Sequence, residues 1–266
     1  MKSWKNYALK NNKFGRINNR LNYIHNILGM DEDDYTTEKR VTINGEEYHP
    51  WCMYVSEKTA NVENYPEYSY LEFSLYIYDS LIDPIFYAEI FHIFRLANPG
   101  DIVHIYINSP GGDISTLCSF SAAIEETKAA VITHIDGSAD SAAFVLAFMG
   151  DEIELSEFAQ MMSHNVSMST SRTNMANLEK YAKNTKIMYK GMLEKYCYRI
   201  LTQEEINSIC ENGTEIHLSS KECEERLKKW EESEKSENDD LKNTENNDEN
   251  AESKEIINSQ DVNKDL

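Results

Sequence analysis

The chain has 266 residues, of which 41% are hydrophobic, so it can bury the core of one enzyme-sized domain. Its net charge of −20 makes nucleic acid an unlikely partner, and no stretch reaches the roughly 20 apolar residues of a membrane helix. The start lacks the apolar run of a secretory signal, so we expect a soluble, cytoplasmic protein that does not contact a membrane. The five cysteines form no Cys-x-x-Cys pair, which argues against a disulfide framework or a zinc site, and we expect neither metal nor cofactor.

Residues 1–70 are interpreted as an N-terminal extension with a basic arm and a small β hairpin. The arm, residues 1–30, holds six lysines and arginines and no acidic residue. Such an arm can bind nucleic acid, a membrane surface or acidic protein, but more often it packs on its own subunit or a neighbour, so we assign it no function. Within residues 40–54, the pair Asn44-Gly45 predicts a hairpin turn.

Residues 71–230 read as one domain in which strands and helices alternate. Apolar runs predict strands at 71–78, 102–107 and 130–135. Helical patterns occupy 84–96, 113–128 and 141–149, followed by a long amphipathic helix at 174–198. Repeated β-α units of this kind build an α/β fold with a parallel or mixed sheet covered by helices.

Residues 231–266 form an acidic C-terminal tail with 13 acidic and 4 basic residues. This segment lacks hydrophobic periodicity and cannot bury enough apolar surface to offset its ordering entropy, so we predict that it is disordered. A solvated tail that keeps the protein soluble is the simpler interpretation, and a segment that docks on a basic partner is the alternative.

Two turns that follow buried strands are candidates for chemistry, because α/β proteins place reactive groups there. Residues 108–112 (NSPGG) end in paired glycines, whose N–H groups can point into a cleft and hold an oxyanion, although paired glycines are also ordinary in turns. Residues 137–143 (GSADSAA) join a strand to an apolar helix. A serine in that segment, Ser138 or Ser141, is either a nucleophile close to the helix N-terminus or only the helix N-cap, and the cap is the simpler interpretation.

A nucleophilic serine needs a base within hydrogen-bond reach, and His164 is the best candidate. It follows residues 155–163, which could return along the sheet to the edge where Ser141 lies. The other histidines considered lie in the extension, inside predicted elements, or at the end of a buried strand: His25, His49, His92, His104 and His134.

The segment YINSPGG at residues 106–112 resembles the signature of Clp protease proteolytic subunits. Residues 137–144 resemble the serine segment of that family, and residues 161–164 (MMSH) and 214–219 (TEIHLS) follow in the family's order. The resemblance covers about residues 71–230. It implies a Clp-protease/crotonase-like α/β fold in which the helix at 174–198 is the family's long handle helix.

The resemblance also implies roles for individual residues. Ser141 would be the nucleophile and His164 the general base, while the backbone N–H groups of Gly112 and Ala142 would form the oxyanion hole. Glu215 stands where the family has the aspartate of the catalytic triad.

Three departures from the family pattern bear on these roles. Glu215 is one methylene longer than aspartate, which alters its reach towards His164. Asp140 replaces a small apolar residue before the serine, where a carboxylate could raise the imidazole pKa or crowd the cleft. Asn165-Val166 replaces the usual Gln-Pro after the histidine.

The function that follows is that of a serine endopeptidase that cleaves unfolded polypeptides inside a chamber. The resemblance implies a homo-oligomer of stacked seven-membered rings, with an AAA+ ATPase unfoldase as a possible partner. Three alternatives remain open: a catalytically degenerate ring or scaffold subunit, a Clp-related virus head-maturation protease, and a crotonase-type acyl-CoA enzyme. The last is the weakest, because nothing in the sequence indicates a nucleotide pocket.

Overall fold

The computed structural model describes residues 17–30, 36–60, 68–168 and 174–234. The chain divides into two compact units, Met1–Lys221 and Glu222–Leu266. The second unit is helical over its described part, residues 222–234, so this helix continues past residue 231, where we predicted the tail to begin. The rest of the acidic tail and residues 1–16 of the basic arm lie outside the described residues. No helix within these ranges combines the length and the apolar character needed to cross a membrane.

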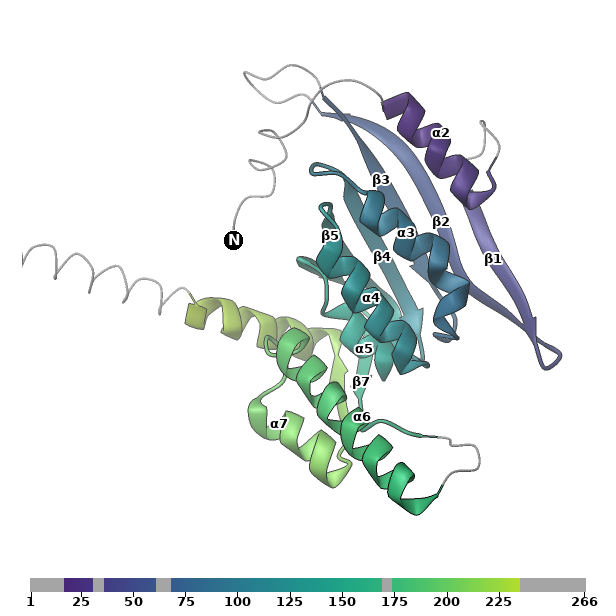
Figure 1. The fold of residues 1–266 in the computed structure, drawn as a ribbon. Helices are drawn as coiled ribbons and strands as arrows, with labels where there is room; N and C mark the ends of the chain where they lie inside the picture. The colour runs from purple at the N-terminus through teal and green to yellow at the C-terminus, as the bar shows by residue number, and fades with distance from the viewer. Residues whose placement is uncertain (1–16, 31–35, 61–67, 169–173, 235–266) are drawn as a thin grey trace, which may run out of the picture. The chain divides into compact units, whose positions relative to one another are not determined.

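A mixed eight-stranded sheet runs through the first unit in the order β1-β2-β3-β4-β5-β7-β8, with β6 pairing β5 off this path (Figure 1). Strands β3, β4 and β5 are parallel, as are β6 and β7 to β5, whereas the pairs β1-β2, β2-β3 and β7-β8 are antiparallel. The three predicted strands are all found, as β3, β4 and β5. The bounds are β1 (Thr36–Ile43), β2 (Glu46–Ala60), β3 (Tyr68–Ile77), β4 (Ile102–Ser109), β5 (Ala130–Asp140), β6 (Glu152–Leu155), β7 (Gln160–Ser163) and β8 (Ile216–Ser219).

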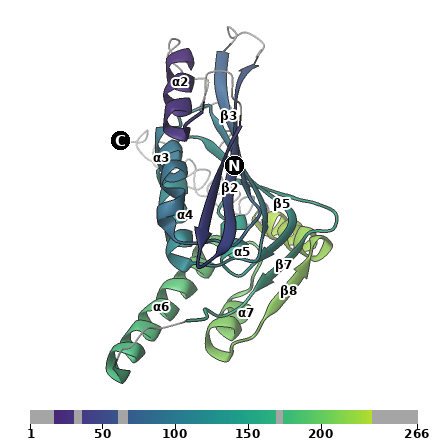
Figure 2. The same ribbon diagram turned by 90° about the vertical axis from the view of Figure 1, so that its right-hand side faces the viewer.

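The predicted helices are also found, which confirms the α/β fold. Two of them, α3 and α4, lie side by side over one face of the sheet (Figures 1 and 2). The bounds are α2 (Ile17–Leu28), the 3-10 turn η1 (Pro84–Tyr87), α3 (Ala88–Leu96), α4 (Ile114–Glu126), α5 (Ala142–Ala147), α6 (Met175–Tyr196), α7 (Gln203–Asn207) and the π-helical turn η2 (Ser208–Asn212).

The core lies between the sheet and these two helices. Alternate residues of β3 are fully buried on this face, as the period of two in a strand requires. Aromatic rings of η1, α3 and α4 pack against one another over this face. Their centroids lie 5.0–6.4 Å apart and most pairs meet edge to face, an arrangement that aromatic pairs prefer. This cluster consists of Tyr87, Phe91, Phe94 and Phe120. It fixes α4, and therefore the glycine turn that leads into α4, against the sheet.

The predicted hairpin is confirmed at Asn44-Gly45. Both residues have positive φ, 52° and 87°, and the flanking residues Ile43 and Glu46 pair directly. This is the two-residue turn whose twist matches that of the strands, and Asn-Gly is its preferred sequence. Strand β2 also pairs with β3, so the hairpin extends the sheet of the domain.

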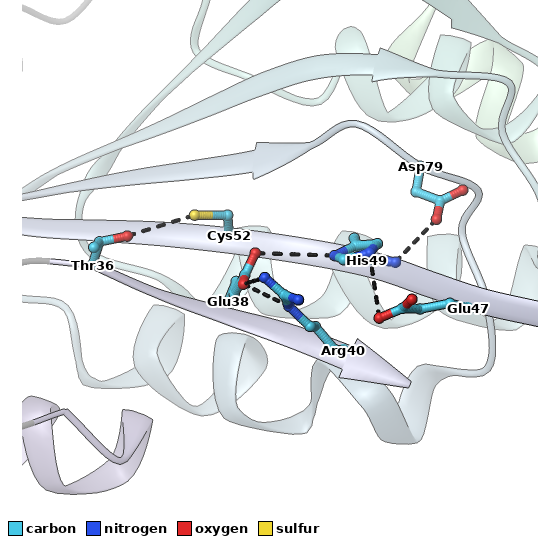
Figure 3. A network of polar contacts seen from close by, with 7 residues as sticks. All are labelled: Thr36, Glu38, Arg40, Glu47, His49, Cys52 and Asp79. Carbon is cyan, nitrogen blue, oxygen red and sulfur yellow. Dashed lines mark hydrogen bonds and ion pairs between the residues drawn. The ribbon is translucent and has the colours of Figure 1, made fainter. Parts of the chain in front are cut away.

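A network of polar contacts on the hairpin includes one link to the segment that follows β3 (Figure 3). Glu38 contacts both Arg40 and His49, and the backbone N–H of His49 donates to Asp79 Oδ2 at 3.0 Å. The ion pairs are exposed, so each contributes little to stability. The bond to Asp79 matters more for the site, because Asp79 lies two residues after β3 and its backbone oxygen accepts a hydrogen bond from Ser109, next to the glycine turn.

Candidate active site

Ser141 occupies a strained turn between β5 and α5. Its φ and ψ are 56° and −120°, and in the described part of the chain the only other residue besides glycine with positive φ is Asn44. Such strain persists only where the surroundings hold it. Here the N–H of Ser141 donates to Met162 O at 2.7 Å, and Asp140 pairs with Met162 in the ladder between β5 and β7. The Ser141 side chain makes no hydrogen bond that caps α5, and a sharp strand-to-helix turn of this kind can present a serine hydroxyl at the end of a sheet.

His164 follows β7 directly, and the structure brings its ring to Ser141. The distance between His164 Nε2 and Ser141 Oγ is 2.8 Å, within hydrogen-bond range. Each residue directly follows one of two parallel neighbouring strands, β5 and β7, so the sheet brings both residues to the same edge. A serine hydroxyl in contact with an imidazole is the arrangement needed for general-base activation.

The glycine turn after β4 packs against the serine turn. Gly111 has φ +85°, and a Cβ atom there would lie 2.4 Å from Asp140 O and 2.8 Å from Ala142 N. Gly112 has φ +145°, and a Cβ atom there would lie 2.2 Å from Leu81 O. Only glycine permits both the backbone conformation and this close approach.

The other residues of the glycine motif hold the two turns in place. Asn108 Oδ1 accepts a hydrogen bond from the N–H of Ser138 at 2.9 Å, which ties β4 to the segment before the nucleophile. The buried hydroxyl of Ser109 donates to Asp79 O at 2.7 Å and accepts from the N–H of Gly111 at 3.2 Å. The motif therefore links the hairpin contact at Asp79 to the turn beside Ser141.

Two backbone N–H groups beside Ser141 remain available. The N–H groups of Gly112 and Ala142 make no hydrogen bond to any residue that the structure describes. Ala142 is the first residue of α5, where an N–H has no partner within the helix. Both residues line a cavity of about 570 Å³, together with Ser141 and His164. A carbonyl oxygen that develops negative charge in this cavity could accept from both groups.

Glu215 does not contact His164, although the backbone brings it close. The pair Ser163↔Ile216 ends the ladder between β7 and β8, so one step further His164 stands opposite Glu215. The Glu215 carboxylate instead lies 3.4 Å from His217 Nε2, and its side chain is 59% exposed. Across the described ranges, no carboxylate makes a hydrogen bond or ion pair with His164.

The other two departures from the family pattern, Asp140 and Asn165-Val166, both involve side chains with hydrogen-bond partners away from His164. The Asp140 carboxylate accepts from Ser138 Oγ at 2.5 Å and makes no contact with His164 in the described part of the chain. Asn165 Nδ2 donates to the backbone oxygen of Cys210 at 3.2 Å, which attaches the segment after His164 to η2. Asp140 therefore neither pairs with the imidazole nor fills the cleft.

Two of the remaining histidines form a separate pair on the sheet. His104 Nδ1 lies 2.8 Å from His134 Nε2, and His134 Nδ1 lies 3.0 Å from Glu154. Burial, and secondly the neighbouring His134, lowers the pKa of His104. These rings contact neither Ser141 nor His164. Within the described ranges, no cluster of three His, Cys, Asp or Glu side chains could hold a metal ion.

One wall of the cavity was not predicted. Tyr181, Thr185 and Tyr189 of α6 line it, and burial raises the pKa of the Tyr189 phenol. Their spacing of four residues places them on one helix face, which the sequence could have indicated. Nothing in the sequence, however, shows that this face turns towards the serine.

Comparisons with known proteins identify a family for most of the described chain. A family model described as Clp protease matches residues 70–225, more than half of the chain. No curated protein was found to match. One similar solved structure is a peptidase from Plasmodium falciparum, with 16% sequence identity, a TM-score of 0.49 and coverage of 58% of this chain and 91% of that chain. That likeness is too weak to bear on function, so the assignment to a family rests on the family model alone.

Proposed function

Because the chain belongs to the Clp protease family, a family of peptidases, we propose that it is a serine endopeptidase with Ser141 as nucleophile and His164 as general base. One contact supports this assignment most directly, the distance of 2.8 Å between Ser141 Oγ and His164 Nε2 on a strained turn. A serine peptidase needs an oxyanion hole as well as an activated serine, and the available N–H groups of Gly112 and Ala142 would form it.

The reaction proceeds in two stages. His164 Nε2 takes the proton of Ser141 Oγ as that oxygen attacks the peptide carbonyl carbon, and the N–H groups of Gly112 and Ala142 stabilise the oxyanion. The protonated imidazole then gives its proton to the leaving amine, and an ester on Ser141 remains. Water, deprotonated by His164, hydrolyses that ester and releases the acid.

A fluorophosphonate probe tests the proposal, since it reacts only with an activated serine. We expect one adduct on the purified protein, which mass spectrometry maps to the peptide that contains Ser141. Absence of an adduct would favour the second candidate, a degenerate ring or scaffold subunit. The observation that favours this candidate is the missing carboxylate contact to His164.

We propose that Glu215 completes a catalytic triad by rotating its side chain from His217 to His164. Its position opposite His164 supports this role. Substituting Glu215→Gln should lower kcat by about 10²- to 10⁴-fold, because a neutral amide stabilises the imidazolium poorly. His217→Ala, which removes the competing partner, should retain or raise kcat. Equal kcat for the native protein and Glu215→Gln in peptide hydrolysis would exclude Glu215 from the triad.

We also propose that the chain assembles into stacked rings of seven that enclose unfolded polypeptide, with an AAA+ ATPase unfoldase as partner. Exposed apolar side chains on α6 support an interface on that helix, namely Met175, Tyr181 and Ile187. Size-exclusion chromatography with light scattering should give the mass of two rings. A strict monomer at all concentrations would contradict this assembly.

A further inference from the structure

The cavity beside Ser141 has an uneven charge. Its lining includes the carboxylate residue Asp113 and, among the described residues, no lysine or arginine. Apart from His164 and two tyrosines, the other lining residues have no ionisable side chain. A cationic substrate side chain that enters this cavity therefore meets one formal negative charge, and no lysine or arginine among the described lining residues competes for it.

Asp113 is held in a fixed position immediately after the glycine turn. Its backbone N–H donates to Leu81 O at 2.7 Å, and its carbonyl accepts from the N–H of Leu117 at 3.2 Å. As the N-cap of α4, it accepts the N–H of Thr116 on Oδ1 at 2.9 Å. The cap orients the carboxylate before any substrate arrives, which reduces the entropy cost of binding a cation.

The second carboxylate oxygen of Asp113 is unused. Oδ2 makes no hydrogen bond or ion pair with any residue in the described ranges, whereas Oδ1 of the same carboxylate accepts the capping hydrogen bond from Thr116. Gly112, whose N–H is part of the proposed oxyanion hole, is the preceding residue. A cation bound by Asp113 Oδ2 would therefore belong to a residue close to the bond that is cleaved.

We propose that Asp113 selects polypeptide substrates with a lysine or arginine close to the scissile bond, an inference that rests on the proposed peptidase function. Asp113 is exposed, so water and salt screen the attraction. The expected preference over a neutral side chain of equal length is about 2- to 10-fold, the range of a partly exposed ion pair.

Equilibrium binding separates this inference from catalysis. The Ser141→Ala protein is titrated into short fluorescein-labelled peptides that are made in pairs. The two members of a pair differ at one position, which is lysine in one and its neutral analogue norleucine in the other, and each pair places this position at a different point along the peptide. We expect the lysine peptide to bind about 2- to 10-fold more tightly at one position at least, and less so as salt is raised. In the Asp113→Asn background this ratio should fall to about 1, while asparagine preserves the helix cap.

Asp83→Asn provides the matched control. Asp83 caps η1 by the same kind of bond, to the N–H of Ile85 at 3.0 Å, but it does not line the cavity. This variant should keep the lysine preference. A preference that survives Asp113→Asn, one lost equally in Asp83→Asn, or no lysine preference at any position would overturn the inference. Failure of the peptidase proposal is seen separately, as a native protein without a probe adduct.

Discussion

Replacing Ser141 with alanine should abolish the fluorophosphonate adduct and lower kcat for peptide hydrolysis by about 10³- to 10⁶-fold. Without Oγ no acyl-enzyme can form, and only the weak catalysis by the oxyanion hole and substrate binding remains. The fold should be retained, because alanine fits the space of serine and meets the same backbone strain at φ 56°. Gel fluorescence and steady-state hydrolysis of a fluorogenic peptide measure the two effects.

Ser138→Ala is the matched control for this substitution. Ser138 lies three residues before Ser141, on β5, and its hydroxyl is hydrogen-bonded to Asp140 rather than to His164. The variant should keep the adduct and most of the hydrolysis. If Ser141→Ala were labelled as strongly as the native protein, Ser141 could not be the nucleophile, whatever the 2.8 Å contact suggests.

The second large effect is expected from Gly111→Ala. Its Cβ atom would lie 2.4 Å from Asp140 O and 2.8 Å from both Ala142 N and Ser141 Cβ, so the two turns must move apart. That movement would displace the serine and an oxyanion donor together, and losing one donor alone typically costs about 10²- to 10³-fold in kcat. We expect at least this loss in hydrolysis, with a slower probe reaction.

Gly45→Ala separates displacement of the site from backbone strain. Gly45 has φ +87°, nearly the value of Gly111, but no atom lies within 4 Å of the added Cβ. Both variants should lose about 1–2 kcal/mol of stability from the left-handed conformation, measured by denaturant unfolding. Only Gly111→Ala should lose catalysis. Equal kcat in the two variants would show that the glycine contact is dispensable for catalysis.

Much of the fold could be predicted because strong local patterns agree with the tertiary structure. Long apolar runs marked the three central strands, and Asn44-Gly45 marked the hairpin. The end of β5 was missed. We predicted a strand ending at residue 135, but it continues to Asp140, because Ala139 pairs with both Ser109 and Met161. That extension depends on neighbouring strands, which a local pattern cannot contain.

The candidate site was predictable to the extent that a motif fixes backbone geometry. The glycine and serine turns could be singled out from their own residues, whereas the choice of Ser141 and Gly112 within them came from the family resemblance. The predicted helix at 141–149 begins one residue later, because positive φ at Ser141 delays it. The direction of the Glu215 side chain could not be predicted, since it depends on competition between His164 and His217 for one carboxylate.

The pairing of β5 with β7 has a consequence for how such a site can change. A shift of β7 by one residue relative to β5 would turn the His164 imidazole to the opposite face of the sheet. The positions of Ser141 and His164 relative to each other therefore cannot be adjusted gradually through the strand register. Part of the cavity wall, in contrast, comes from α6 and the start of α4, which are not part of that ladder. Substrate preference can therefore diverge on these helices while the spacing of hydroxyl and imidazole stays constant.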